Sequence, residues 1–112
     1  MTRTPSLKTI QAYTRKWLVR LGMGHWEVTI RFMNKEESEG EFEECNGFCR
    51  WSEQHTHAEI VISREAENWR HTCIHECLHL RLEGHRPLTR TKADIPLEVT
   101  INALTRAFLG GK

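Results

Sequence analysis

Two histidines four residues apart, with a glutamate directly after the first, are the residues of this chain best suited to chemistry. The segment His75-Glu76-Cys77-Leu78-His79 has the pattern H-E-x-x-H. On a helix, both imidazoles project from one face and can reach a single metal ion. Glu76 is rotated from His75 by about 100°, where its carboxylate can meet a metal-bound water without binding the metal. The pattern therefore predicts zinc on His75 and His79, with Glu76 as the general base of a hydrolysis.

A catalytic zinc site usually takes three protein ligands, so a third ligand should lie elsewhere in the sequence. His85 follows His79 by six residues, but on a helix continuing to Glu83 it would point about 240° away from His79. Glu98 lies at the start of a later predicted helix, off the apolar stripe. The alternative for Glu98 is a first-turn carboxylate that is there only because the helix dipole favours it. We expect Glu98 to join His75 and His79 on one catalytic Zn²⁺. His85 remains the alternative third ligand.

Several further polar residues could belong to such a site. Asn102, one turn after Glu98, could orient a ligand through a hydrogen bond. His71 lies one turn before His75 on the same face, where it could border a cleft or simply lie on the helix surface. The pattern selects no oxyanion stabiliser. The candidates are Tyr13, His55, His57 and several arginines.

Four cysteines allow a different interpretation as a structural metal site. Cys45 and Cys49, like Cys73 and Cys77, are separated by three residues, which falls within the broad range of structural zinc sites. However, Cys77 lies nearly opposite the histidine pair on the predicted helix. We therefore expect buried thiols on the core side of that helix. A four-cysteine zinc site and a disulfide remain the alternatives.

Helical apolar spacing predicts three helices. The first spans residues 6 to 21, with Ser6 as its N-cap. The second spans residues 64 to 83, is capped by Ser63 and carries the H-E-x-x-H pattern. The third begins near Asp94 and packs through an apolar stripe of Leu97, Ile101, Leu104 and Phe108.

Alternating apolar and polar residues predict the strands. Residues 25 to 32 form the first strand, and residues 47 to 52 and 57 to 63 form two more, joined by a polar turn. An Asn46-Gly47 pair offers a competing hairpin turn. The order helix, three strands, helix, helix predicts an α+β fold with a small, mostly antiparallel sheet against helices.

The acidic stretch from residue 34 to residue 44 has no periodic apolar pattern and is predicted to be an exposed loop. The chain has 112 residues, 38% hydrophobic and 28% charged, which suits one domain over residues 1 to 112 and leaves too little apolar surface for a second core. A net charge of +1 gives no overall attraction for nucleic acid, and no apolar run approaches the roughly 20 residues that cross a bilayer. We expect a cytoplasmic protein with a peptide or protein substrate, and no nucleic-acid or membrane partner.

The chain resembles the minigluzincins and related small phage and prokaryotic metallopeptidases. The similar features are a Trp-containing strand after the first helix, the segment 58 to 62 before the active helix, the H-E-x-x-H-L motif, and a closing helix with Glu98. They span residues 7 to 109. The resemblance implies a zincin-like fold, zinc on the two histidines and Glu98, Glu76 as general base, and a peptide laid along a sheet edge.

Two other functions compete with a zinc peptidase. His75, His79 and His85 share the histidine spacing of a bacterial ribosome-maturation endoribonuclease family, whose pattern resembles H-G-x-L-H-L-x-G-x-D-H. Glu76 replaces its first glycine, and the G-x-D-H ending is absent. A non-catalytic zinc-binding module is the third possibility. We expect a zinc peptidase in which Glu76 activates a zinc-bound water for peptide-bond hydrolysis.

Overall fold

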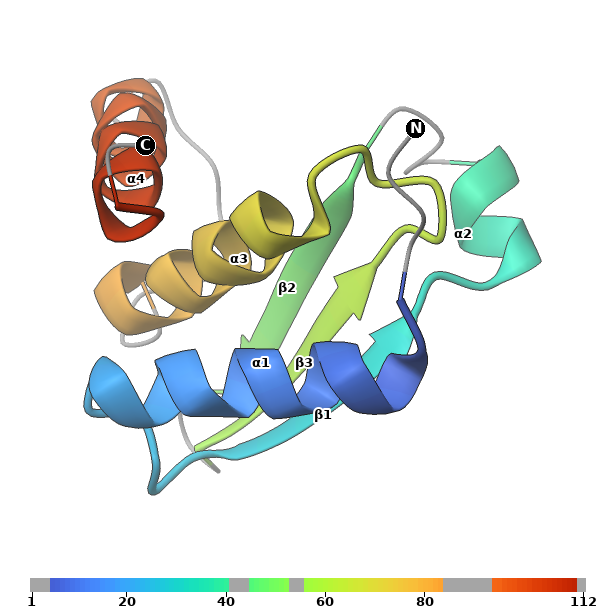
Figure 1. Ribbon diagram of the computed structural model, residues 1–112, viewed down its shortest axis with the longest axis horizontal. Coiled ribbons are helices and arrows are strands. Elements are labelled where there is room, and N and C mark those ends of the chain that lie inside the picture. The colour runs from blue at the N-terminus through green and yellow to red at the C-terminus, as the bar shows by residue number, and fades with distance from the viewer. Residues whose placement is uncertain (1–4, 41–44, 53–55, 84–93, 111–112) are drawn as a thin grey trace.

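The elements follow one another as α1 (Leu7–Arg20), β1 (Glu27–Phe32), α2 (Lys35–Glu39), β2 (Gly47–Ser52), β3 (His57–Ile62), α3 (Trp69–Glu83) and α4 (Asp94–Phe108). The computed structural model describes residues 5–40, 45–52, 56–83 and 94–110, except for the side chains of residue 83 and residues 94–98. Figure 1 shows α1 and α3 over one face of the sheet, with α4 beside α3. The predicted α+β fold class is confirmed at this level.

The sheet is mixed, with strand order β1-β3-β2, so the prediction of a mostly antiparallel sheet is wrong. β3 pairs in parallel with β1 and in antiparallel fashion with β2. The physical reason is the burial of β3, because the most buried strand is most stable in the centre of a sheet. Its buried residues are Ala58, Ile60, Val61 and Ile62.

The predicted strands are confirmed to within about two residues at their ends. Val28 and Ile30 of β1 are buried beneath the helices, as the alternation predicts, and Trp26 and Phe32 are half-buried. The Asn46-Gly47 hairpin is wrong, because β2 begins at Gly47 and pairs with β3, not with β1. Of the polar turn between β2 and β3, residues 53–55 lie outside the described residues.

α1 begins where the sequence predicts, because the Ser6 side chain accepts a hydrogen bond from the backbone N–H of Thr9. The helix ends before Gly22, whose φ of 77° is in the left-handed region that favours glycine. Gln11 fixes α1 on the sheet by donating from Nε2 to the carbonyl oxygen of Ile30 at 3.0 Å. The buried face of the helix comprises Ile10, Thr14, Trp17 and Leu18.

α2 corrects the prediction of an exposed loop in the acidic stretch, of which residues 41–44 lie outside the described residues. Asn34 Oδ1 accepts a hydrogen bond from the backbone N–H of Glu37 at 2.8 Å, and Glu37 Oε1 accepts one from the backbone N–H of Asn34 at 2.9 Å. This reciprocal capping box stabilises one helical turn without any apolar stripe. The Asn-x-x-Glu spacing therefore indicates this short helix in the sequence, whereas the spacing of apolar residues does not.

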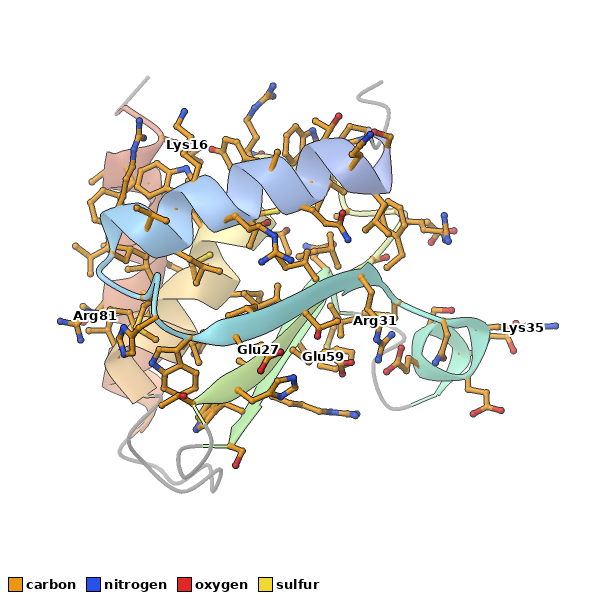
Figure 2. The ribbon with its side chains drawn as sticks, turned by 90° about the horizontal axis from the view of Figure 1, so that it is seen from below. Lys16, Glu27, Arg31, Lys35, Glu59 and Arg81 are labelled. Atoms are coloured by element: carbon orange, nitrogen blue, oxygen red, sulfur yellow. The ribbon has the colours of Figure 1, made fainter. Side chains whose placement is uncertain are left out.

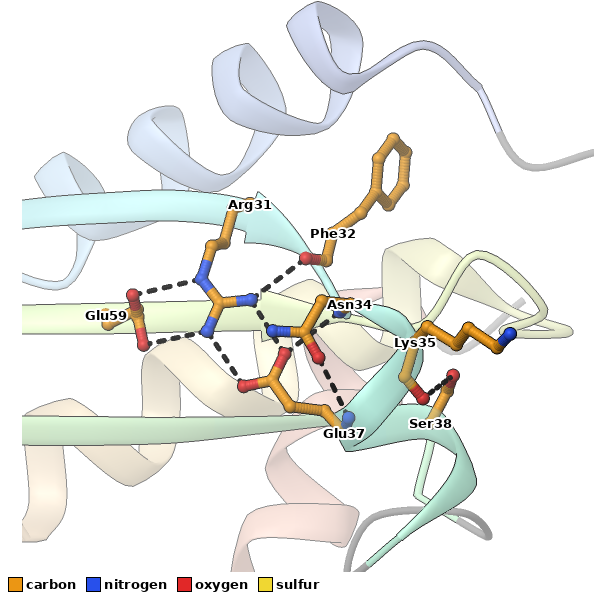
Figure 3. Close-up of polar contacts among 7 residues, drawn as sticks. All are labelled: Arg31, Phe32, Asn34, Lys35, Glu37, Ser38 and Glu59. Atoms are coloured by element: carbon orange, nitrogen blue, oxygen red, sulfur yellow. Dashed lines mark hydrogen bonds and ion pairs between the residues drawn. The ribbon is translucent and has the colours of Figure 1, made fainter.

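Arg31 ties α2 to the sheet (Figures 2 and 3). Its guanidinium donates to both carboxylate oxygens of Glu59 on β3, at 3.0 and 3.2 Å, and to both of Glu37 on α2, at 2.8 Å each. A fifth hydrogen bond goes to the carbonyl oxygen of Phe32. Hydrogen bonds from Arg31 lower the pKa of Glu37 to about 2. Arg31 thus joins three elements through one planar, five-donor group.

α3 begins five residues later than predicted, so its assignment to residues 64–83 with Ser63 as N-cap is wrong. Ser63 Oγ instead accepts from the backbone N–H of Glu65 and closes a local turn. Asn68 Oδ1 accepts from the backbone N–H of His71 at 3.2 Å, directly before the helix. Ser63 and Asn68 can each cap a helix, and it is Asn68 that caps α3.

α4 begins at Asp94, as predicted. Ile101 is fully buried and Leu104 packs against the core, while the side chain of Leu97 lies outside the described residues. Phe108 is 39% exposed and contacts Trp17 of α1 at a ring-centroid distance of 5.2 Å. Within the described ranges, no helix combines the length and apolarity that crossing a membrane requires.

We predict that Glu37→Gln lowers the free energy of unfolding by about 1–2 kcal/mol at pH 7, because it removes one charge from the Arg31 contact. The folded pKa of Glu37 is about 2, below its ordinary value of 4.5, so this stability is present above pH 4.5 and is lost as the pH falls toward 2. Urea unfolding of both proteins at several pH values measures the difference, which should shrink at low pH.

Glu36→Gln is the matched control, because Glu36 is the exposed neighbour of Glu37 in the same helix. It should change stability by less than about 0.5 kcal/mol. Equal losses in the two variants, or a loss in Glu37→Gln that does not change with pH, would contradict this role for Arg31 and Glu37.

Candidate metal centre

α3 is the central helix of the molecule, contacted by α1, α4, β2 and β3. Its residues 72 to 80 are all buried except His75, which is half-buried. Two of the buried residues are Glu76, at 6% exposure, and His79, at 5%. Glutamate is rarely buried to this degree without a specific role, since removing a charge from water is costly. These residues therefore bring polar groups into the buried middle of α3.

The two motif histidines converge on each other. Their Nε2 atoms lie 3.1 Å apart, with ring centroids 4.8 Å apart and ring planes inclined by 61°. At this distance one Nε2–H can donate to the other nitrogen. Two nitrogens that bind one tetrahedral zinc at about 2.0–2.1 Å would lie about 3.3–3.4 Å apart. The separation in α3 is within a few tenths of an ångström of that spacing, so the pair fits a zinc ion.

Glu76 lies next to His75 in the sequence and inside the core of the fold. Burial is the main cause that raises the pKa of the Cys73 and Cys77 thiols, and the negative charge of Glu76 adds to it. A buried carboxylate can accept and return a proton where bulk water is largely excluded. α3 thus carries two converging imidazole nitrogens and one buried carboxylate.

The third ligand cannot be placed from the described side chains. Glu98 belongs to α4, which packs against α3, but its side chain lies outside the described residues. His85 also lies outside them. Among the side chains that are described, no three histidine, cysteine, aspartate or glutamate residues are grouped closely enough to hold a metal ion. A complete site therefore needs a ligand from beyond that part, and both predicted candidates lie there.

His71 extends the row of histidines by one further turn. Its ring stacks on that of His75, with centroids 5.9 Å apart and planes inclined by 26°. His71 is half-buried, and its pKa is lowered first by desolvation and second by the positive charge of Arg106 on α4. The structure therefore places His71 against the candidate site. No pattern in the sequence indicated that Arg106 lies near it.

The cysteines do not form a second metal site. All four lie in the described part of the chain, where none is in a disulfide and no three of them are grouped for a metal. Cys73 and Cys77 are fully buried thiols, as predicted, and Cys77 Sγ lies 3.8 Å from the carbonyl oxygen of Thr14 on α1. Burial raises the pKa of Cys73 to about 11 and that of Cys77 well above its ordinary value. Cys45 is exposed instead.

The candidates for an oxyanion stabiliser lie on several elements. Tyr13 packs edge-on against Trp69 at the start of α3, with centroids 5.1 Å apart. His57 is exposed at the first position of β3, and His55 lies outside the described residues. Asn102 is half-buried on α4. The stabiliser therefore stays unassigned.

No protein-family model, curated protein or solved structure matches this chain. The resemblance to minigluzincins therefore stays a prediction that rests on the residues of the chain itself. The architecture supports the α+β class with a mixed sheet. The zincin-like assignment within that class is also still a prediction.

Gly47 allows β2 to approach α3 one turn before Glu76. A Cβ atom added at Gly47 would lie 2.8 Å from Thr72 Cγ2 and 2.8 Å from the carbonyl oxygen of Val61. Such short contacts force a shift, and a backbone oxygen in a paired strand cannot shift easily. The absence of a side chain at this position therefore sets the distance between β2 and the helix that carries the site.

We predict that Gly47→Ala destabilises the protein by about 1–3 kcal/mol, because the methyl group overpacks the β2–α3 contact. Gly24→Ala is the control, since its Cβ would meet only Val19 Cγ2, at an ordinary 3.7 Å. Thermal and urea unfolding of both variants measure the effect. Unchanged stability in Gly47→Ala would show that α3 does not pack this closely on β2.

Proposed function

We propose that this chain is a zinc-dependent peptidase of zincin-like fold, in which His75, His79 and Glu98 bind one Zn²⁺ and Glu76 is the general base. One observation carries the proposal. The Nε2 atoms of His75 and His79 converge to 3.1 Å on the central helix, and Glu76, which lies between them in the sequence, is buried. Titratable groups that converge in a largely buried part of a fold are typical of sites that perform chemistry.

The chemistry follows from these groups. Zinc bound there supplies a Lewis acid that lowers the pKa of water to about 7. Glu76 accepts a proton from the water as its oxygen attacks the carbonyl carbon of the scissile peptide bond. The Glu76 carboxyl group then returns this proton to the amine nitrogen as the C–N bond breaks. Burial of Glu76 supports this role, because it keeps bulk water from competing for the proton.

Glu98 is the third ligand that the fold favours. It belongs to α4, the helix that contacts α3 directly, and Arg106 of α4 acts electrostatically on His71 beside the histidine pair. Glu98 precedes Arg106 by eight residues, or about 12 Å along the helix axis, which equals the distance from His71 to His79 along α3. If α3 and α4 run in opposite directions, these matched lengths bring the Glu98 backbone toward the turn that carries His79.

A peptide is the proposed substrate. The resemblance to minigluzincins implies it, and a general base between the two histidines suits hydrolysis with water as the nucleophile. β2 is the outer strand of the described sheet on the side where α3 packs, so an extended strand flanks the site. Strands at the edge of a sheet are common platforms for extended peptides.

We predict that Glu76→Gln retains one zinc per chain and loses peptide cleavage by at least about 100-fold, because the amide cannot accept the proton of water. Zinc content after dialysis and cleavage of a fluorogenic peptide library measure the two properties separately. Glu67→Gln is the control, since Glu67 is an exposed carboxylate just before α3 and should change neither property.

Three outcomes would contradict the proposal. Persistent peptide cleavage in Glu76→Gln would remove Glu76 as the base. Cleavage of RNA, lost on substitution His85→Ala, would favour the endoribonuclease. Tight zinc binding by the wild-type protein with no hydrolysis across the library would favour a non-catalytic zinc-binding module.

A further inference from the structure

We propose that His71 is a positioning residue that holds the His75 imidazole in its metal-binding orientation before any metal arrives. The inference rests on the proposed function, because it assumes that His75 binds zinc. It concerns a residue outside the H-E-x-x-H motif, one helical turn before the first histidine. His71 acts through His75 and does not itself touch the metal.

His75 lies between two other imidazoles on α3. On one side His71 stacks on it, with planes inclined by 26° and centroids 5.9 Å apart. On the other side His79 meets it edge-on, with planes inclined by 61° and centroids 4.8 Å apart. The two neighbours therefore restrict the ring of His75 from opposite ends of the row.

This restriction matters because His75 is less buried than the residues around it on α3. A half-buried side chain keeps rotamer freedom, and fixing it when a ligand binds opposes binding. Stacking against His71 removes part of that freedom in advance. The Nε2 atom of His75 is then already aimed at that of His79, 3.1 Å away.

The stacked geometry argues against His71 as a ligand to the same ion. Ligand nitrogens must converge on one point, as those of His75 and His79 do, whereas the nearly parallel rings of His71 and His75 lie side by side. His71 and His79 are also about 12 Å apart along the helix axis. The His71 ring thus contributes contact area, not a donor atom.

The backbone of His71 is fixed at the start of α3. Its N–H donates to Asn68 Oδ1 at 3.2 Å, so His71 lies in the capped first turn of the helix. The side chain of His71 is half-buried and stacks on that of His75. The capped turn therefore fixes the backbone position from which the His71 ring reaches His75.

The test compares His71→Ala with His71→Phe. Zinc affinity is measured by competition with a chromophoric chelator, and the Co²⁺-substituted proteins give the visible spectrum of the metal site. His71→Ala should bind zinc about 10-fold more weakly and change the Co²⁺ spectrum, as substitutions behind a metal ligand generally do. His71→Phe keeps a ring but no nitrogen, so it should stay within about 3-fold of wild type.

Arg70→Ala is the control for general damage to the helix. Arg70 is exposed, neighbours His71 in the sequence, and stacks over the ring of Trp69 at 4.5 Å. Its zinc affinity should equal that of wild type. Circular dichroism of all variants shows whether they keep the fold.

A metal-free readout separates this inference from the proposed function. In the apo protein, NMR of the His75 side chain should show one ordered rotamer in wild type and His71→Phe, and rotamer averaging in His71→Ala. Wild-type zinc affinity and unchanged order of His75 in His71→Ala would overturn the inference and leave the peptidase proposal intact. Affinity in His71→Phe as weak as in His71→Ala would also overturn it. A wild-type protein that binds no zinc would instead overturn the proposed function, while the NMR result would still decide whether His71 orders His75.

Discussion

The burial of α3 is the constraint on which the other elements depend, because this helix packs against the sheet and against both long helices at once. Its core-facing side includes Cys73, Ile74 and Cys77, all fully buried. β3 supplies the opposing apolar surface, and Gly47 lets β2 come close to Thr72. Burying Glu76 and His79 on the same helix opposes folding, so a site here depends on stability gained elsewhere in the fold.

Several stabilising polar contacts lie at the sheet and at the ends of the helices. Arg31 joins β1, β3 and α2 through five hydrogen bonds, and Gln11 links α1 to β1. The capped start of α3 fixes the turn that contains His71. These contacts stabilise the fold at the sheet and at the helix start. The proposed site, in the middle of α3, would then be held by a scaffold whose stability comes from other residues.

Local geometry made part of this structure predictable from sequence. Helical spacing predicts the histidine pair and places Cys77 on the opposite face of the helix. Capping predicts the start of α1 at Ser6. The parallel pairing of β1 with β3 could not be predicted in this way, because it joins segments far apart in the chain. α2 was missed since its stability comes from a capping box, and the start of α3 was misplaced because Ser63 and Asn68 compete as caps. The orientation of His71 against His75 depends on rotamers that a sequence pattern does not encode.

The central claim is that the converging nitrogens of α3 hold a catalytic metal ion. Anomalous diffraction at the zinc absorption edge, from crystals of the zinc-loaded protein, tests it most directly. The account predicts one zinc ion at about 2.0–2.1 Å from the Nε2 atoms of His75 and His79, with a carboxylate oxygen of Glu98 as the third protein ligand. Zinc bound away from this pair, or bound by His85 in place of Glu98, would contradict it.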